Sequence, residues 1–435
     1  MRHYQYVIGF GTLTAACAAG FADPTTLTFF GALPGQTGSR AVAVSADGYT
    51  VTGLANTPSG EVAVRWTPAH GLVSLGTLPG DVTSEGVCVS ADGQRIIGRS
   101  NGPSGSRAFL WTSQAGMTAF GENPLNSYPM SLAGAEDVVV GESLALTPDA
   151  ARWIDGGVVS PLGGSSGGFV PGARSAFACS NDGSIVVGRA DTVSGYHAFR
   201  WTEASGYQDL GTLPGGALST AYDVSPSGSV VVGSATDPAG GEHAFRWTAA
   251  GGMQRLTSST DFQGSIALST SADGNTIVGV CWYNTPPYSN APQRQPFMWT
   301  PQLGFVRLNQ YLVTLGVLSF GTMNIAEATS VSDDGRVIVG WGTYRTPGPI
   351  DHYEGYMLRL AGARPLCPAD LGIQGGFTGH DGQLDNNDFV AFINLFFLQD
   401  PQADVGVQGG LHGADGLWNN NDFVVFIGDF FSGCP

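Results

Sequence analysis

The hexapeptide His-Ala-Phe-Arg-Trp-Thr stands at residues 197–202 and returns unchanged at residues 243–248. Shortened or altered copies stand at residues 62–67, 107–112, 151–153, 296–300 and 356–359. Copies that recur about every 45 residues are the mark of a repeat protein, in which each unit packs on its neighbours. The sequence therefore contains seven copies of one structural unit.

Each unit reads as four short β-strands. Most units carry an apolar run that ends in Ser, then an Asp-Gly pair, then a Val/Ile run that ends in Gly. Asp-Gly between two apolar stretches predicts a tight hairpin, because Gly adopts the positive φ that the turn needs. The third strand holds the Trp, and a fourth follows as Leu-Gly-Thr-Leu-Pro-Gly at residues 210–215. Four strands in about 45 residues are typical of one blade of a β-propeller.

The two ends of the array complete each other. Residues 27–35 read as a fourth strand with no blade before them, and the last copy stops after its third strand, near Leu360. Pairing the first strand with the last blade closes the ring and removes the sheet edges that promote aggregation. The sequence predicts an all-β, seven-bladed propeller over residues 23–362, closed by its N-terminal strand.

The repeats resemble the HAF family of bacterial extracellular repeats, named for the His-Ala-Phe at residues 197–199 and 243–245. The Leu-Gly-Thr-Leu-Pro-Gly-Gly at residues 210–216 fits the same pattern, and the resemblance covers roughly residues 25–361. It implies a propeller fold and an extracellular location, and it implies no particular chemistry.

Composition and the first residues favour an exported protein. The net charge is −17 and none of the 18 basic residues is a lysine. This charge disfavours nucleic acid as a partner, and the lack of lysine excludes Schiff-base chemistry. Residues 1–22 read as a signal peptide whose apolar stretch is too short for a permanent membrane span. We expect a secreted or cell-surface protein, with a lipid anchor at Cys17 as the alternative.

A second duplication occupies residues 366–435. Asp370 aligns with Asp404, and the run at residues 386–388 aligns with residues 420–422. Apolar residues follow each run at the spacing of one helix face. They are Phe389, Phe392, Ile393, Phe396 and Phe397 in the first copy, and Phe423, Phe426, Ile427, Phe430 and Phe431 in the second. We expect two loop–helix units that bury these faces against each other.

Each loop of the tail carries part of a calcium-binding pattern. Asp-Gly-x-x-[Asp/Asn]-x-x-Asp matches the last positions of an EF-hand loop, in which oxygen ligands surround the metal. The nearest upstream acids, Asp370 and Asp404, would need a longer Gly-rich loop to reach it. The predicted calcium ligands are Asp370, Asp381, Asp385, Asp388, Asp404, Asp415, Asn419 and Asp422. The alternative is that Asn386 and Asn420 cap two helices without metal.

The tail also resembles the dockerin-like domains of some secreted bacterial proteins, with Cys-Pro-Ala-Asp at residues 367–370 and Gly-Cys at residues 433–434. The resemblance implies attachment to a cohesin-like or cell-envelope partner. Cys367 and Cys434 bracket this small domain, and a disulfide between them is expected in an exported protein. The cysteines of the propeller are expected to be small buried hydrophobic residues, with Cys88 and Cys179 at one strand position of different blades.

No catalytic residue is predicted. Residues 164–168 fit G-x-S-x-G, but they lie in a Gly-rich β loop and not in a strand–turn–helix. His197 and His243 recur at one repeat position, which favours blade packing over a metal pair. Turn formation accounts for the Asp residues of the Asp-Gly pairs.

Insertions in the last two blades break the repeat between their second and third strands. The same face of a propeller carries both insertions, so we expect their aromatic and basic residues to meet on one rim. These candidate ligand-binding residues are Trp282, Tyr283, Tyr288, Arg294, Trp341, Tyr344, Arg345 and Tyr353. Aromatic faces beside a few polar groups suit a sugar or a peptide. The alternative is that these loops only cover the closure of the ring.

Three functions remain open from the sequence. The first is a non-catalytic extracellular binding protein, with carbohydrate as a candidate ligand and the tail as its attachment. The second is a propeller-based polysaccharide hydrolase or lyase, which close-set carboxylates on the rim would favour. The third is a purely structural repeat protein of the envelope.

Overall fold

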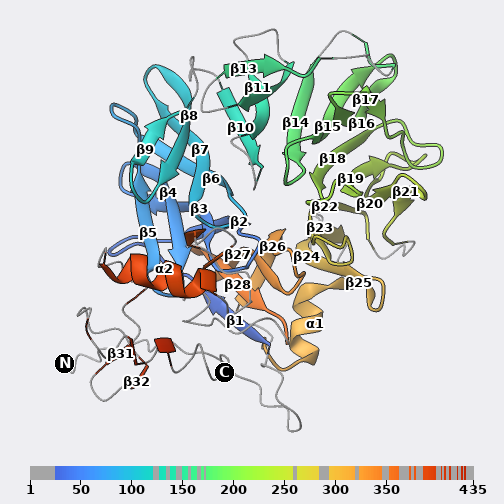
Figure 1. Ribbon diagram of the computed structural model, residues 1–435. Coiled ribbons are helices and arrows are strands. Elements are labelled where there is room, and N and C mark those ends of the chain that lie inside the picture. The colour runs from blue at the N-terminus through green and yellow to red at the C-terminus, as the bar shows by residue number, and fades with distance from the viewer. Residues whose placement is uncertain are drawn as a thin grey trace.

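Seven four-stranded antiparallel sheets follow one another around a ring in the computed structural model (Figure 1). Residues described in the propeller are 25–120, 127–133, 138–143, 149–154, 158–163, 168–170, 173–257, 262–283, 293–318, 323–344 and 352–361. Those described in the tail are 372–373, 377–378, 386–397, 403, 406–407, 411–412, 419, 423–424 and 426–427. The prediction of an all-β propeller with seven blades is confirmed.

Each blade runs from an inner strand to an outer strand in chain order. Blade 1 contains β2 (Ser39–Val44), β3 (Val51–Thr57), β4 (Gly60–Thr67) and β5 (Gly71–Gly76). Blade 2 contains β6 (Thr83–Val89), β7 (Arg95–Gly102), β8 (Gly105–Thr112) and β9 (Gly116–Ala119). Blade 3 contains β10 (Ser127–Leu132), β11 (Val138–Ser143), β12 (Asp149–Ile154) and β13 (Val158–Pro161). Blade 4 contains β14 (Arg174–Cys179), β15 (Ile185–Thr192), β16 (Gly195–Thr202) and β17 (Gly206–Asp209).

Blades 5 to 7 keep the same strand order, but a helix follows blade 6 and blade 7 takes its fourth strand from the N-terminal end of the chain. Blade 5 contains β18 (Ser219–Val224), β19 (Val230–Thr236), β20 (Glu242–Thr248) and β21 (Gly252–Arg255). Blade 6 contains β22 (Gly264–Thr270), β23 (Ile277–Tyr283), β24 (Gln293–Thr300) and β25 (Gly304–Arg307), and the helix α1 (Leu308–Thr314) follows it. Blade 7 contains β26 (Met323–Val331), β27 (Val337–Tyr344) and β28 (His352–Arg359), and its fourth strand is β1 (Thr26–Phe29) from the other end of the chain.

The closure pairs β1 with β28 in antiparallel register, and it uses the same serine as the other blade junctions. Ser39 Oγ accepts the N–H of Gly355 at 3.2 Å and donates to the carbonyl of Gly31 at 2.5 Å. Ser84 and Ser219 make the same two bonds between blades 1 and 2 and between blades 4 and 5. The predicted closure by the N-terminal strand is therefore confirmed.

A β-bulge recurs at one place in every inner strand. In β2 the register with β3 shifts between Ala41 and Ala43, and an equivalent shift occurs in all seven blades. The Gly that ends each Val/Ile run lies opposite the bulge. A Cβ at Gly53 would come within 2.0 Å of the carbonyl oxygen of Arg40. This glycine of the repeat is thus required by close backbone approach.

Asp-Gly turns occur in five blades, and each joins its blade to the one before it. Gly48 has a φ of 75°, and a Cβ there would come within 2.5 Å of Val337 in blade 7. Asp47 accepts the hydroxyl of Ser45 and the N–H of Tyr49. The same bonds hold the turns at Asp92, Asp182, Asp273 and Asp334. Turn formation therefore accounts for these carboxylates.

Two short hairpins and α2 (Asn386–Phe397) belong to the tail. The hairpins are β29 (Gly372–Ile373) with β30 (Phe377–Thr378), and β31 (Gly406–Val407) with β32 (Leu411–His412). Phe392 stacks on Phe426 at 3.9 Å between ring centroids, and residues 423–424 and 426–427 are helical. In the described part of the tail, the two predicted apolar faces therefore do face each other.

Among the residues that the structure describes, no helix has both the length and the apolar character needed to cross a bilayer. The predicted signal peptide at residues 1–22 and the cysteines Cys17, Cys367 and Cys434 lie outside the described residues.

Candidate functional site

The two faces of the ring differ in what they present. We call the face that carries the Asp-Gly turns the bottom face, and the opposite one, where the second strand of a blade leads into its third, the top face. The predicted ligand-binding residues belong to the strand ends at the top of blades 6 and 7. Trp282 and Tyr283 end β23, Arg294 begins β24, and Trp341, Tyr344 and Tyr353 lie in β27 and β28.

A carboxylate joins three of the strands on this rim. Glu327 of β26 accepts the indole N–H of Trp341 on Oε2 at 2.9 Å and binds Arg294 of β24 through Oε1 at 2.8 Å. The Glu327 side chain is 16% exposed, whereas that of Arg294 is 57% exposed. Glu327 thus holds a solvent-facing guanidinium and a tryptophan in fixed positions.

An arginine from blade 1 completes the group. The guanidinium carbon of Arg40 lies 4.8 Å from the ring centroid of Trp341 and 4.5 Å from that of Tyr353. The two rings themselves meet edge to face at 5.4 Å. We call Arg40, Arg294, Glu327, Trp341 and Tyr353 the rim cluster. Its members come from blades 6, 7 and 1, so the cluster exists only because the ring closes.

The rim cluster exposes guanidinium groups to a ligand, whereas its aromatic rings are partly covered. Arg40 covers one face of Trp341 and of Tyr353, and Tyr353 remains 36% exposed. Glu327 pairs with Arg294, while no ion pair reaches Arg40 among the described residues. A ligand that approaches here meets an exposed tyrosine and two guanidinium groups. Carboxylate or hydroxyl groups of a ligand suit such donors.

The other predicted rim residues have different surroundings or lie outside the description. Tyr283 lies under Arg307 at 5.2 Å, and the Trp282 ring packs over Gly264. Only the backbone of Tyr344 is described, where it pairs with Met323 and His352. Tyr288 and Arg345 lie outside the described residues.

Sequence reasoning missed Arg40 and Glu327. Both stand on inner strands at equivalent register positions, immediately before the paired residue that precedes the bulge. Blade 2 has Glu85 at this position, paired with Arg99. A charged residue at the top of an inner strand was therefore the available signal.

A second polar group surrounds the ring axis below the bulge. One residue of each blade follows the bulge, and we call these the neck residues. They are Ala43, Cys88, Ser131, Ala178, Asp223, Ser269 and Ser330. A cavity of about 140 Å³ lies beside them, lined by residues of all seven blades.

The neck side chains bind the backbone of the next blade. Ser269 Oγ accepts the N–H of Val331 at 3.3 Å, and Asp223 Oδ2 accepts that of Thr270 at 2.9 Å. Ala178 cannot accept a bond, and Asp223 Oδ1 instead accepts the N–H of its own neighbour Val224 at 2.8 Å. Burial raises the pKa of Asp223 to about 6. These bonds give the neck a structural role, since its carboxylate is occupied.

The cysteine assignment needs one correction. Cys88 pairs with Ile97, and the equivalent residue in blade 4 is Ala178, so Cys179 lies one position further along its strand. Ser131 of blade 3 approaches Cys179, with Oγ 3.7 Å from Sγ. The two cysteines therefore do not share a strand position, because Cys88 lies two residues before the serine of its Asp-Gly turn and Cys179 lies one residue before. Burial raises the pKa of Cys179 and of Cys281 to about 12, as expected for unreactive buried thiols.

The two histidines considered as a metal pair each bind a carboxylate of their own blade. His197 binds Asp209 and His243 binds Asp237, each at 2.9 Å and each within its own blade. In the described ranges, no group of three or more His, Cys, Asp or Glu side chains is placed to hold a metal ion. Residues 164–167 of the G-x-S-x-G match lie outside those ranges.

The predicted calcium ligands are only partly described. Asp388 is the third residue of α2, and Asn419 precedes the second helical segment. Asp370, Asp381, Asp385, Asp404, Asp415 and Asp422 lie outside the described residues.

Comparison with known proteins supports the fold alone. No protein-family model matches the chain, and no curated protein matches it. An oligogalacturonate lyase from Vibrio parahaemolyticus is similar in structure, with a TM-score of 0.50 and 10% identity over 80% of this chain and 96% of that one. A prolyl endopeptidase gives a TM-score of 0.49 and 10% identity over 74% of this chain and 50% of that one. TolB from Acinetobacter baumannii gives 0.40 and 11% identity over 59% of this chain, and the match spans 62% of the TolB chain. The similarity to the lyase structure agrees with the β-propeller fold and shows nothing beyond the fold.

Proposed function

We propose that the protein is a secreted or cell-surface binding protein without catalytic activity, whose rim cluster binds a carbohydrate that carries carboxylate groups. The observation that carries this proposal is the pair of guanidinium groups, Arg40 and Arg294, held beside the exposed ring of Tyr353. Arginine donates paired N–H groups that match a carboxylate, and a tyrosine ring offers an apolar face to the C–H groups of a sugar.

A glycan array with the purified chain tests the proposal. We expect the wild type to retain uronate-containing glycans, and Tyr353→Ala and Arg40→Ala each to reduce retention about tenfold, the effect of losing about 1.4 kcal/mol. Tyr196→Ala is the matched control, because Tyr196 occupies the same position of the third strand in blade 4. Retention of no glycan, or equal retention by the Tyr353→Ala variant, would refute the proposal.

The alternative is a polysaccharide lyase or hydrolase that uses the same rim. Glu327 is the carboxylate that favours it, because it lies on the rim between Arg294 and Trp341. Such an enzyme would release new reducing ends or unsaturated products from a uronate polymer, and Glu327→Gln would abolish that release. Binding without turnover by the wild type would favour the non-catalytic function.

For the tail we propose calcium binding and attachment to a cohesin-like or cell-envelope partner, as its dockerin-like sequence implies. Two observations support the proposal. A hairpin pairs Gly372 with Thr378 within the Gly-rich stretch that separates Asp370 from Asp381 in the sequence, and a hairpin pairs Gly406 with His412 in the second copy. Asp388 also falls in the first turn of α2, as the last ligand of an EF-hand loop does.

Calorimetric titration of the full chain with calcium tests the tail. We expect binding at two sites, and Asp388→Ala together with Asp422→Ala should remove it while the unfolding of the propeller stays unchanged. Heat release that is the same in this double variant would contradict the assignment.

A further inference from the structure

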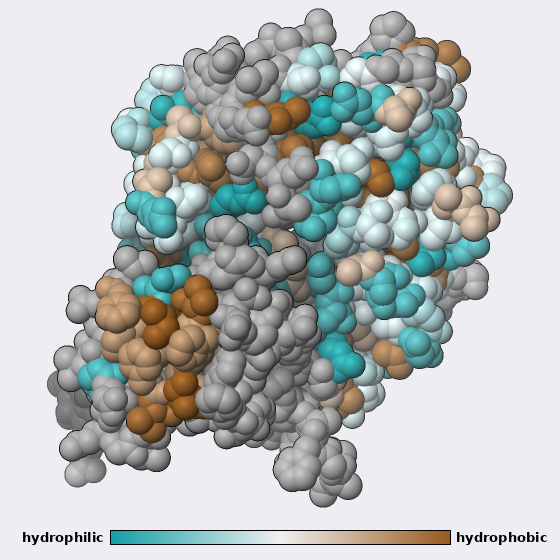
Figure 2. Space-filling view, in the orientation of Figure 1, coloured by the Kyte–Doolittle hydropathy of each residue, from teal (hydrophilic) through white to brown (hydrophobic). Residues whose placement is uncertain are grey.

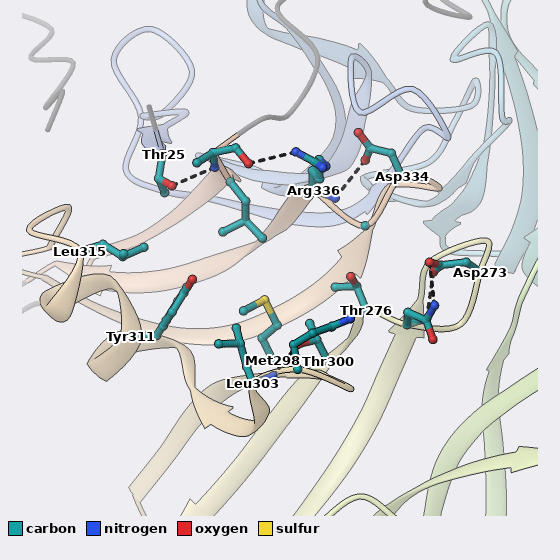
Figure 3. Close-up of a pocket in the computed structure, with 15 residues that line it drawn as sticks. Thr25, Asp273, Thr276, Met298, Thr300, Leu303, Tyr311, Leu315, Asp334 and Arg336 are labelled. Carbon is teal, nitrogen blue, oxygen red and sulfur yellow. Dashed lines mark hydrogen bonds between the residues drawn. The ribbon is translucent and has the colours of Figure 1, made fainter. Parts of the chain in front are cut away.

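A pocket opens on the bottom face between blades 6 and 7, away from the rim cluster. Its volume is about 410 Å³, within the range of about 300–1,000 Å³ that is typical of small-molecule sites. Figure 3 shows Met298, Leu303 and Tyr311 along one side and Asp334 and Arg336 across from them. The helix α1 supplies Tyr311, and Leu315 follows directly after it, so part of the pocket wall comes from outside the repeat.

The repeat explains why a pocket forms at this junction. Met298 occupies the register position that holds an arginine in blades 1, 3, 4 and 5. In blade 5 that arginine, Arg246, reaches the next blade and donates to the carbonyl of Gly274 at 3.0 Å. A methionine has no N–H for the equivalent carbonyl of Gly335. The gap that an arginine bridges between blades 5 and 6 is therefore left open between blades 6 and 7.

The junctions after blades 1 and 3 also fill this space with the arginine, whereas blades 2 and 7 carry Leu110 and Met357 at the position. Arg65 lies over Trp111 between blades 1 and 2, and Arg152 lies over Trp201 between blades 3 and 4. At the ring closure Arg359 takes a related place, with its NH1 group 3.5 Å from the carbonyl of Gly48. With Met298 in place of the arginine, blade 6 therefore lacks the hydrogen bond to the next blade, and the space beside Met298 forms part of the pocket.

One side of the pocket is apolar and the other can form hydrogen bonds. Tyr311 is half-buried, Met298 is 1% exposed, and Leu303 and Leu315 are exposed at the mouth. Opposite them, Arg336 donates to the carbonyl of Ala361 at 3.1 Å, which leaves its other N–H groups for a ligand. This combination of an aromatic face and fixed polar groups suits a sugar ring.

The charges of the lining disfavour a strongly anionic ligand. Two carboxylates, Asp273 and Asp334, stand against one guanidinium, Arg336. Burial raises the pKa of Asp273, but the bonds from Ser271 and Asn275 outweigh it and leave the pKa below its usual value. Asp273 is thus ionised at neutral pH. Asp334 uses Oδ1 for its turn, and among the described residues no hydrogen bond is made by Oδ2.

We propose that this pocket binds a short neutral saccharide, with its apolar face on Tyr311 and Met298 and its hydroxyl groups on Asp334 and Arg336. The site is independent of the rim cluster, which lies on the other face and favours ligands with carboxylates. A saccharide stacks its C–H face on an aromatic ring and donates hydroxyl hydrogens to carboxylates, which matches the two sides of the pocket.

Saturation-transfer NMR and calorimetry with cellobiose, di-N-acetylchitobiose and digalacturonate test the proposal. The full chain is used with Tyr353→Ala and Arg40→Ala together, so that binding at the rim cluster is at least about tenfold weaker. We expect at least one of the two neutral disaccharides to bind, and digalacturonate to bind at least about tenfold more weakly because it adds two negative charges to an anionic site.

Two further variants locate the site. Met298→Arg restores the arginine of the repeat and fills the pocket, and Leu303→Trp blocks its mouth from an exposed position. Each should weaken binding of the neutral disaccharide about tenfold or more. Ala115→Trp is the matched control, because Ala115 occupies the same turn position in blade 2. If Met298→Arg does not fold, Leu303→Trp decides.

Three results would overturn the proposal. They are binding of neither neutral disaccharide, binding of the neutral disaccharide that Leu303→Trp leaves unchanged, and preferential binding of digalacturonate that Leu303→Trp weakens. None of these bears on the rim cluster, so failure here is distinguishable from failure of the proposed function.

Discussion

Asp223 joins blade 5 to blade 6 through a buried carboxyl group, which makes the free energy of unfolding depend on pH. It accepts the N–H of Thr270 in the next blade, and it also accepts the N–H of Val224, which Ala178 of the preceding blade cannot accept. Burial nevertheless dominates and raises the pKa of Asp223 to about 6, and the nearby Asp333 adds to this effect. The folded chain therefore binds this proton more tightly than the unfolded chain does.

The sign of the resulting pH dependence follows from these values. The stability contributed by protonated Asp223 is fully present below about pH 4, the pKa in the unfolded chain, and is lost as the pH rises through about 6. The difference between the two pKa values sets an upper limit of about 3 kcal/mol on this loss of stability. Water in the adjoining cavity would reduce the loss, because it eases the burial of the charged carboxylate.

Asp223→Ser tests this assignment with the residue that blades 3, 6 and 7 carry at the same place. Relative to the wild type, the free energy of unfolding of this variant should rise by up to about 3 kcal/mol between pH 4 and pH 7. Urea denaturation at several pH values measures the difference. Glu61→Gln, at an exposed position, is the control. A difference that does not vary with pH would show that Asp223 has an ordinary pKa.

At the scale of single elements, α2 depends on one phenylalanine. Phe392 is fully buried and stacks on Phe426, whereas Phe397 on the same helix is 76% exposed. Figure 2 shows the exposed apolar side chains of this region gathered on the surface around α2. The two side chains offer a matched pair of truncations.

We predict that Phe392→Ala destabilises the tail by about 3–5 kcal/mol and that Phe397→Ala costs less than about 0.5 kcal/mol. Limited proteolysis of the full chain, followed by mass spectrometry, should show early cleavage within residues 366–435 only in the Phe392→Ala variant. Equal resistance of both variants would mean that the helix is not held by this stacked pair.

The elements themselves were predictable because the repeat is dense with local signals. Asp-Gly pairs, the Gly opposite the bulge and the Trp strand each fix one strand or turn of a blade. The rim cluster was predictable only in part, since Arg40 and Trp341 are far apart in the chain and meet through ring closure. The pocket beside Met298 had a signal, the missing arginine of the repeat, but its meaning depends on knowing that this side chain spans two blades.

At the scale of the whole molecule, the pairing of β1 with β28 closes the ring. We call this pairing the seam. Removing residues 23–31 leaves an unpaired strand edge on β28 and takes away the carbonyl of Gly31 that Ser39 binds. We predict that this truncated chain aggregates, as exposed edge strands do. Size-exclusion chromatography measures the monomer fraction. A chain cut after Ala361, which keeps the seam, should stay monomeric, and a monomeric seam deletion would contradict the prediction.

The pairing of the two chain ends at this seam also determines when the ring can close during synthesis. Ala361 donates to Thr25 across 336 residues of chain, so the ribosome makes the closing strand first and its partner last. Six blades can assemble while the seventh is still missing, but the circle stays open until nearly the whole propeller has emerged. Completion is then a single late event, and any chain that stops early remains an open arc.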